Sequence, residues 1–229
     1  MTRSLACCFK TFPWHIRGKR NSLFVLLLAA LLLGAIDRPH AAFGQLTTVK
    51  VADASALKPP PGARVAIVEF DDLECPTCAH FNPLLKQAAA TSKSPWIRHD
   101  FLIPYHNWSR AAAVDARWFD IKSKTLGDEY RDQIFANQPY IYNIGVLNQF
   151  TQKFMQSHGI APPLAFDPQG KLEAAVQADT DLGKRTGVDS TPTIFIVTAK
   201  ANGVRYMQVL DPDHDLYHTI DQALAETRH

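Results

Sequence analysis

The chain is poor in the sulfur-containing residues that build several common kinds of site. It holds four cysteines and three methionines among 229 residues, and Cys7 and Cys8 both precede a long apolar run. The chain beyond that run keeps two cysteines, too few for a framework of several disulfide bridges. The methionines form no cluster of soft ligands for copper(I). A zinc site would have to draw its remaining ligands from scattered histidines or carboxylates.

The N-terminal segment lacks acidic residues, since none occurs before Asp37, whereas five Lys or Arg residues precede an apolar run from Leu23 to Ile36. This run has the length of a signal-peptide core and is shorter than the roughly 18 residues that a membrane-spanning helix needs. We predict a signal peptide at 1–42, with an uncleaved signal anchor as the alternative. The remainder is then exported, to the periplasm or elsewhere outside the cytoplasm, and is either free or membrane-anchored through the apolar segment.

A strong excess of basic charge is also missing. Without residues 1–42 the chain has 18 basic and 21 acidic residues, a net charge of −3, and it shows no basic patch. We therefore expect no nucleic-acid partner. The remaining length, with no internal repeat, suits one well-cored domain.

Beyond a predicted arm and linker at 43–62, strand and helix patterns alternate. Their order is strand, helix, strand, a long helical section, a hairpin and a last helix. The predicted ranges are 64–70, 78–90, 96–103, 108–185 with breaks near Gly127, Gly145 and 161–163, then 193–197, 204–210 and a helix carrying Leu216, Ile220 and Ala223. This order predicts an α/β thioredoxin fold with an inserted helical domain. Its parts are a first half at 63–104, the helical insertion at 105–187 and a second half at 188–229.

The motif Cys75-Pro76-Thr77-Cys78 follows the first strand and opens the first helix. Pro76 suits the first turn of a helix, where its missing N–H costs no hydrogen bond, and the helix N-terminus favours an anion. The pKa of Cys75 should therefore fall from about 8.5 into the range of roughly 3.5–7.5 found in such motifs. Cys78, one turn later, can attack a mixed disulfide on Cys75. Because a bridge across so short a loop stabilises the fold little, the spacing favours a redox pair, with metal binding as the alternative.

Two stretches resemble a known family. EFDDLECPTC resembles the signature of the DsbA-like thiol–disulfide oxidoreductases, exported bacterial members of the thioredoxin superfamily, and GVDSTPTIFI resembles their cis-proline loop. The resemblance implies that Cys75 is the nucleophile, Cys78 the resolving cysteine and Glu69 a buried acid beneath them. It also implies that Thr191 and Pro192 face the cysteines through a cis bond, with the Thr191 backbone binding substrate. No dissociable cofactor is needed, because the dithiol carries the electrons.

These observations predict an exported protein thiol–disulfide oxidoreductase that acts on cysteines of other exported proteins, in the first instance as a disulfide-forming oxidase. The alternatives are a reductase or isomerase and, from a different class, a metal-binding module that uses both thiolates. The resemblance further implies a membrane redox partner, either a quinone-linked thiol oxidase or an electron donor.

Three residues depart from the pattern of the strongest oxidases. Thr77 stands where those members tend to have histidine, Thr191 is more typical of reducing relatives, and the charge of Glu74 would oppose a thiolate on Cys75. We therefore expect the pKa of Cys75 to lie below that of a free thiol but not at the bottom of the range.

The other polar residues around the motif receive less specific predictions. Glu69 is predicted to be a buried general acid and base for Cys78, with a solvent-facing glutamate at the strand end as the alternative. Asp71 and Asp72 are predicted to be surface or helix-capping acids. His80 is predicted to be a partly exposed helical residue, with tuning of the thiols as the alternative. Three further histidines are predicted to be surface or structural residues: His99, His106 and His158.

Overall fold

The computed structural model describes residues 57–200 and 203–228, which all belong to one unit of the chain, 46–229. The predicted signal segment at 1–42 and most of the predicted arm lie outside the described residues. Among the residues that are described, no helix is both long and apolar enough to cross a membrane.

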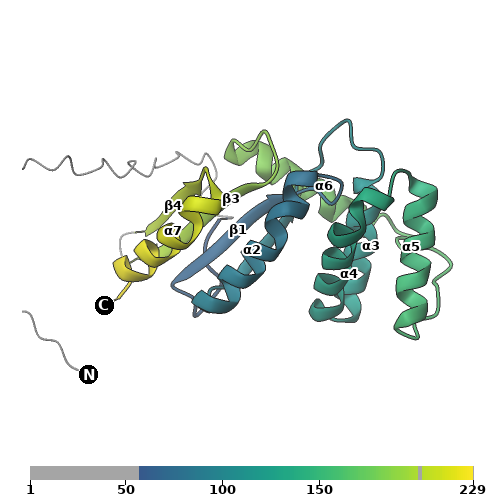
Figure 1. The fold of residues 1–229 in the computed structure, drawn as a ribbon, viewed down its shortest axis with the longest axis horizontal. Helices are drawn as coiled ribbons and strands as arrows, with labels where there is room; N and C mark the ends of the chain where they lie inside the picture. Colours follow the sequence, from purple (N-terminus) through teal and green to yellow (C-terminus); the bar gives the residue numbers. More distant parts are fainter. Residues whose placement is uncertain (1–56, 201–202, 229) are drawn as a thin grey trace, which may run out of the picture. The chain divides into compact units, whose positions relative to one another are not determined.

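A four-stranded sheet forms the centre of the fold (Figure 1). Its strands are β1 (Val65–Asp71), β2 (Trp96–Asp100), β3 (Thr193–Lys200) and β4 (Gly203–Val209). The spatial order is β2-β1-β3-β4, in which β1 pairs parallel with β2 and antiparallel with β3. All seven residues of β1 are buried, which explains its continuous apolar run, because both faces of this central strand are covered.

Helices cover the two faces of the sheet. Two of them, α2 (Pro76–Ser92) and α7 (Pro212–Glu226), pack over one face, where Val65 and Ile67 meet Leu85 and Leu216. Figure 1 shows this helix pair in front of the strands. Helix α6 (Lys171–Thr186) supplies Leu182 to the core of the opposite face. Gly183 permits its close approach, since a Cβ there would overlap the Phe101 ring.

The remaining helices stand beside the sheet at the end of the view that holds α5 (Figure 1). They are α3 (Ser109–Lys122), α4 (Lys124–Asn137), the 3-10 helix η1 (Gln138–Tyr140) and α5 (Ile144–Ser157). Their shared core contains Trp108, Phe119 and Tyr130, and it also includes Cys75 and Cys78. The helical section is thus packed directly against the start of α2.

The predicted elements are all present in the described residues, but several boundaries differ. Helix α2 begins at Pro76 instead of residue 78, and β2 ends at Asp100 instead of residue 103. The predicted break near Gly127 is wrong. The chain breaks at Ser123, whose side chain caps α4. Gly127 lies inside α4, and its lack of a side chain leaves room for Asp120, with which a Cβ would collide.

The other two predicted breaks are confirmed. Asn143 caps the start of α5, close to Gly145. Between Ser157 and Lys171, where residues 161–163 lie, there is neither helix nor strand. The α/β class and the helical insertion agree with the prediction.

Candidate active site

The two cysteines lie at the start of α2. Cys75 is the N-cap residue and Pro76 follows at the first helical position, as predicted. Cys75 is 6% exposed, whereas Cys78 is completely buried, and both are free thiols. Of the two cysteines, Cys75 but not Cys78 lines a cavity of about 370 Å³ at the start of α2. A reacting group therefore reaches Cys75 first, with Cys78 behind it.

The two thiols differ in acidity. A hydrogen bond from the Cys78 thiol is the main cause that lowers the pKa of Cys75 to about 6, helped by the Thr191 side chain and the backbone N–H groups of Cys78 and Thr77. Burial is the main cause that raises the pKa of Cys78 well above its usual range, and its hydrogen bond to Cys75 adds to it. At neutral pH the pair is thus a thiolate at Cys75 and a thiol at Cys78. The value for Cys75 agrees with the predicted intermediate range.

The loop before β3 faces Cys75. The Thr191-Pro192 peptide bond is cis, as predicted. Cys75 Sγ donates a hydrogen bond to the Thr191 carbonyl oxygen at 3.3 Å, and Asp189, Ser190 and Thr191 line the cavity. The two motifs that are far apart in the sequence therefore meet at one site.

Glu69 lies on the same side of β1 as the start of α2, because it shares its parity along the strand with Val65 and Ile67. It is 1% exposed, and its Oε2 accepts a hydrogen bond from Trp96 Nε1 at 3.0 Å. Burial, with a contribution from Asp71, raises the pKa of Glu69 to about 8. The solvent-facing alternative is wrong, and the carboxyl holds a proton at neutral pH.

Asp71 and Asp72 are neither surface residues nor caps of α2, whose N-cap residue is Cys75, so that prediction is wrong. Both are 2% exposed. Asp71 Oδ2 accepts hydrogen bonds from Arg98 at 2.8 and 3.0 Å, and the Arg98 guanidinium lies 4.6 Å from the Trp96 ring centroid. The neighbouring strand β2 supplies this partner, which a strand pattern alone does not reveal.

Asp72 connects the cysteine loop to the residues that follow β2. Its Oδ2 accepts from Ile103 N at 2.8 Å and its Oδ1 accepts from Glu74 N at 2.8 Å. His106 Nδ1 lies 3.0 Å from Oδ1. The loop thus held brings Ile103, Pro104, Tyr105 and His106 to the cavity beside Cys75.

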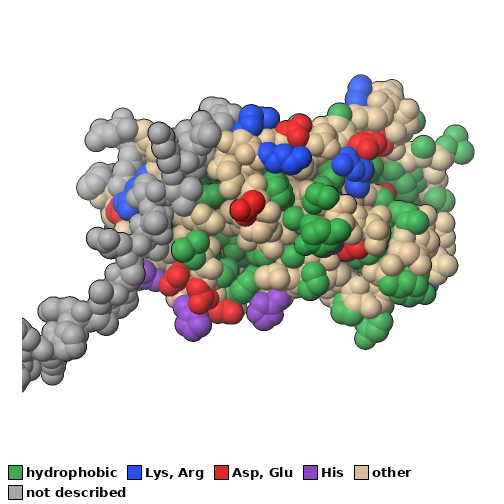
Figure 2. All heavy atoms as spheres, turned by 90° about the horizontal axis from the view of Figure 1, so that it is seen from above, with side chains coloured by type: hydrophobic (Ala, Val, Ile, Leu, Met, Phe, Trp, Pro, Cys, Tyr) green, Lys and Arg blue, Asp and Glu red, His purple; other side chains and the backbone are tan. Residues whose placement is uncertain are grey.

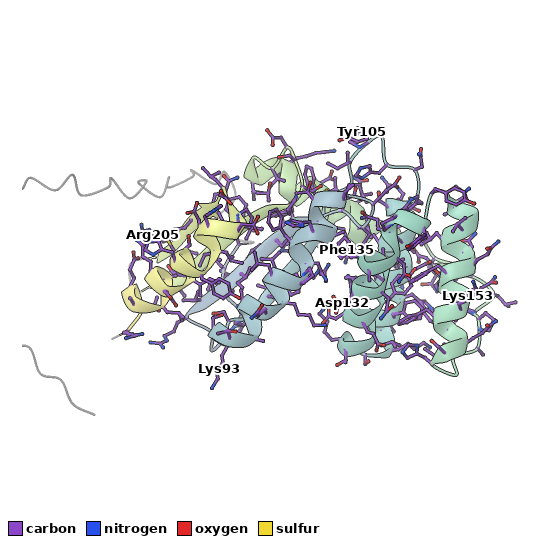
Figure 3. All side chains as sticks on the ribbon, in the orientation of Figure 1. Lys93, Tyr105, Asp132, Phe135, Lys153 and Arg205 are labelled. Atoms are coloured by element: carbon purple, nitrogen blue, oxygen red, sulfur yellow. The ribbon has the colours of Figure 1, made fainter. Side chains whose placement is uncertain are left out.

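In Figure 3 Tyr105 lies at the top of the view and Lys93, the C-cap of α2, lies at the bottom, at the end of that helix away from the cysteines. The sequence contains no signal that His106 belongs to the site.

Glu74 and Gln138 tie the same loop to the helical section. Glu74 Oε2 accepts from Trp108 N at 2.7 Å and from Ser109 N at 3.1 Å, so it caps α3, which has no side-chain cap of its own. Gln138 Nε2 donates to the carbonyls of Leu73 and Cys75. The predicted effect of Glu74 on the thiolate is not among the main influences on the pKa of Cys75.

Metal binding was the predicted alternative. In the residues that the structure describes, no group of three or more His, Cys, Asp or Glu side chains is placed to hold a metal ion. Two thiols without further ligands fall short of the four that a structural zinc site requires.

A family model described as thioredoxin matches residues 60–211, more than half of the chain. The chain belongs to the thioredoxin family. Three solved structures share the fold of this thioredoxin-family chain at low sequence identity. The thiol-disulfide exchange protein alpha-DsbA2 from Wolbachia pipientis has 18% identity and a TM-score of 0.57, and the match covers 72% of this chain and 84% of that one. BdbD from Bacillus subtilis has 19% identity and a TM-score of 0.59, with 73% of this chain and 91% of that one covered. DsbA2 from Pseudomonas aeruginosa has 18% identity and a TM-score of 0.55, with 81% of this chain and 98% of that one covered.

These matches confirm the predicted fold class and the resemblance to DsbA-like members of the thioredoxin superfamily. No curated protein sequence matches the chain significantly.

Proposed function

We propose that the protein is an exported thiol–disulfide oxidoreductase that forms disulfides in other exported proteins through the Cys75–Cys78 pair. The observation that carries the proposal is the difference in acidity between the two thiols, with the pKa of Cys75 lowered to about 6 and that of Cys78 raised. A stabilised thiolate favours the reduced form of the pair, which makes its disulfide a better oxidant.

In the oxidising direction a substrate thiolate attacks Cys75 Sγ of the disulfide form. The Cys75–Cys78 bond breaks, and its electron pair leaves on the Cys78 sulfur. Because the pKa of Cys78 is raised, this sulfur takes up a proton, and the buried Glu69 carboxyl is the group suited to supply it. A second substrate thiolate then attacks the mixed disulfide, and Cys75 leaves readily as a low-pKa thiolate.

Thr191 is the residue best suited to hold the substrate chain. When Cys75 is protonated, its thiol donates a hydrogen bond to the Thr191 carbonyl oxygen at 3.3 Å. A mixed disulfide has no such proton, so the carbonyl becomes free to accept a backbone N–H from an extended substrate, as in strand addition. Main-chain pairing of this kind suits many different substrate sequences.

The surface around the site also suits unfolded substrates. Figure 2, which views the molecule from above the orientation of Figure 1, shows hydrophobic side chains gathered over the middle of this face. Three tyrosines are strongly exposed, Tyr105, Tyr140 and Tyr142. Tyr105 lines the cavity, and Tyr140 belongs to η1, which Gln138 links to the Cys75 carbonyl.

The proposal includes the location and the redox partner. The predicted signal segment at 1–42 supports export, and disulfide-forming proteins work in oxidising compartments such as the periplasm. A disulfide-forming role requires a membrane thiol oxidase linked to quinones for reoxidation, whereas a reducing role requires a membrane electron donor.

A glutathione redox titration of the Cys75/Cys78 pair tests the proposal, together with oxidation of a reduced, unfolded substrate. We expect a potential between roughly −270 mV for thioredoxin and −120 mV for DsbA. We also expect substrate oxidation that Cys75→Ser abolishes. A potential at or below that of thioredoxin would favour the reductase. Stoichiometric metal after native purification, without thiol–disulfide exchange, would favour the metal-binding module.

A further inference from the structure

The cavity beside Cys75 contains a histidine that the proposed exchange reaction does not yet use. His106 lies in the loop between β2 and α3, and its side chain is 13% exposed. It lines the same cavity as Cys75 and Thr191. Its backbone N–H bonds to the Ile103 carbonyl at 3.0 Å, and its ring packs edge-on against Tyr105 at 5.0 Å between centroids. The imidazole is therefore held at the place where a substrate thiol must arrive.

A buried carboxylate lies beside this imidazole. The side chain of Asp72 is 0% exposed and lies 3.0 Å from His106 Nδ1. His106 Nδ1 makes no well-aligned hydrogen bond to this carboxylate. Catalytic hydrogen bonds are often poorly aligned in the absence of substrate. The N–H groups of Ile103 and Glu74 hold the carboxylate in place. With Nδ1 facing the carboxylate, Nε2 is the nitrogen left to exchange a proton.

We propose that His106 is the general base that takes the proton from the incoming substrate thiol. This inference rests on the proposed function. The substrate S–H bond breaks as its proton moves to His106 Nε2, and the thiolate sulfur forms a bond to Cys75 Sγ. The Cys75–Cys78 bond breaks, and Cys78 leaves with the electron pair and takes a proton. The substrate sulfur is oxidised, the protein disulfide is reduced, and the imidazolium returns its proton to solvent.

Cys75 itself has other means of ionisation, since Cys78, Thr191 and the start of α2 lower its pKa. The substrate thiol has none of these. At pH 7 about 3% of an ordinary thiol with a pKa near 8.5 is ionised, so complete deprotonation could accelerate its attack by at most about thirtyfold. Histidine is the side chain that most often acts as a general base in enzymes.

Several charged or titratable groups face His106 from the elements packed around it. Asp72 lies beside its Nδ1, and Cys75, Tyr105 and Asp189 line the cavity of about 370 Å³ with it. Arg110 and Lys184 share with His106 a second cavity of about 220 Å³. Burial raises the pKa of Asp72, whereas its N–H donors and His106 lower it. A pH profile of the whole protein would therefore mix several titrations, and the test needs a comparison between two substrates.

The experiment measures how fast the oxidised full-length protein forms a mixed disulfide with each of two thiols at pH 7. One is a cysteine peptide with an ordinary thiol, and the other is an aromatic thiol that is already ionised at this pH. The variant is His106→Gln, which cannot take up a proton. The matched control is His80→Gln, because His80 lies on α2 with a side chain that is 67% exposed.

We expect His106→Gln to react about tenfold more slowly with the peptide and at the wild-type rate with the aromatic thiol. The difference should disappear above pH 9, where the peptide thiol ionises unaided. Equal slowing with both thiols would show that His106 only supports the loop, and no slowing with either would also overturn the inference. The aromatic thiol reports whether the variant site is intact. A wild-type protein that exchanges with neither thiol would refute the proposed function itself.

Discussion

The carbonyl oxygen of Thr191 accepts a hydrogen bond from the Cys75 thiol at 3.3 Å, although the two residues are 116 positions apart in the sequence. Thr191 acts on the sulfur in two opposite ways. Its carbonyl favours the protonated thiol, because it can accept but not donate, whereas a hydrogen bond from its side chain lowers the pKa of Cys75. The acidity of Cys75 therefore depends on the loop before β3 as well as on α2.

Replacing Thr191 with valine separates these two effects, because it removes the hydroxyl and leaves the carbonyl. We expect Thr191→Val to raise the pKa of Cys75 by up to about one unit, which also makes the disulfide a weaker oxidant. The ultraviolet absorbance of the thiolate as a function of pH measures the first effect, and the glutathione titration measures the second. Thr193→Val is the matched control, since the hydroxyl of Thr193 bonds to Ser190 instead of the sulfur. An unchanged pKa in Thr191→Val would contradict the assignment.

The Cys78 thiol is the main cause of the low pKa of Cys75. Cys78→Ala removes this donor, so we expect the pKa of Cys75 to rise above the value of about 6, whereas Cys78→Ser, which keeps a hydroxyl donor, should raise it less. In the opposite sense, Thr77→His adds a group that can be positively charged beside the sulfur and should lower the pKa. The thiolate absorbance of reduced protein tests all three variants. A pKa in Cys78→Ala equal to that of the wild type would show that the Cys78 thiol does not lower the pKa of Cys75.

The sequence predicted the part of the site that depends on local patterns. Cys75 and Pro76 stand where a helix N-terminus needs them, and the alternation along β1 turns Glu69 toward α2. The cis-proline loop was recognised from its own short motif and its position before an apolar strand.

The remainder of the site depends on contacts between distant segments, which no local pattern carries. His106 enters the site because Asp72 binds Ile103 N and draws the loop after β2 toward the cysteines. The incorrect break at Gly127 has a related cause, since that glycine serves close packing against Asp120 instead of ending a helix. Residue type suggested the local role, but the tertiary neighbour decided it.

Glu69 should make the stability of the reduced protein depend on pH. Its pKa is raised to about 8 from an ordinary value of 4.5, so between these values the folded protein keeps a proton that the unfolded chain has lost. The contribution to stability is complete below about pH 4.5 and is lost as the pH rises to about 8. Glu69→Gln has no such proton, so its free energy of unfolding should not fall in this way. The difference in free energy of unfolding between the variant and the wild type should therefore shift in favour of the variant by on the order of a few kcal/mol from pH 5 to pH 8.

Urea unfolding of both proteins at pH 5 and pH 8, under reducing conditions, measures this difference. The titration of Cys75 acts in the opposite direction but is present in both proteins, so it cancels in the comparison. The matched control is Glu173→Gln, because the Glu173 side chain is 57% exposed. The same pH dependence in Glu69→Gln and the wild type would contradict a buried, protonated carboxyl.

The same Glu69→Gln variant should slow the step in which Cys78 loses its proton to attack a mixed disulfide on Cys75. The carboxyl must be ionised to accept this proton, so we expect the release of glutathione from a preformed mixed disulfide to slow by about tenfold at pH 8 and above, where Glu69 ionises. Alkylation of Cys75 should stay close to the wild-type rate, because the carboxyl acts on Cys78 and is only a minor influence on the nucleophile. An unchanged release rate between pH 5 and pH 9 would remove Glu69 from the proton transfer.

Glu74 provides the last prediction, because its position contradicts the effect that its sequence neighbourhood suggests. Its carboxylate accepts from Trp108 N and Ser109 N at the start of α3, where a negative charge also suits the helix dipole. Loss of a helix cap costs about 0.5–2 kcal/mol, so we expect Glu74→Ala to destabilise the protein by about 1–2 kcal/mol and Glu74→Gln, which keeps an acceptor, by less.

Because the charge is directed at α3, Glu74→Gln should change the pKa of Cys75 by less than about 0.3 units. Glu129→Gln, an exposed acid paired with His158, is the control for loss of one negative charge. If Glu74→Gln instead lowered the pKa of Cys75 by a full unit without loss of stability, the carboxylate would be acting on the thiolate and not on α3.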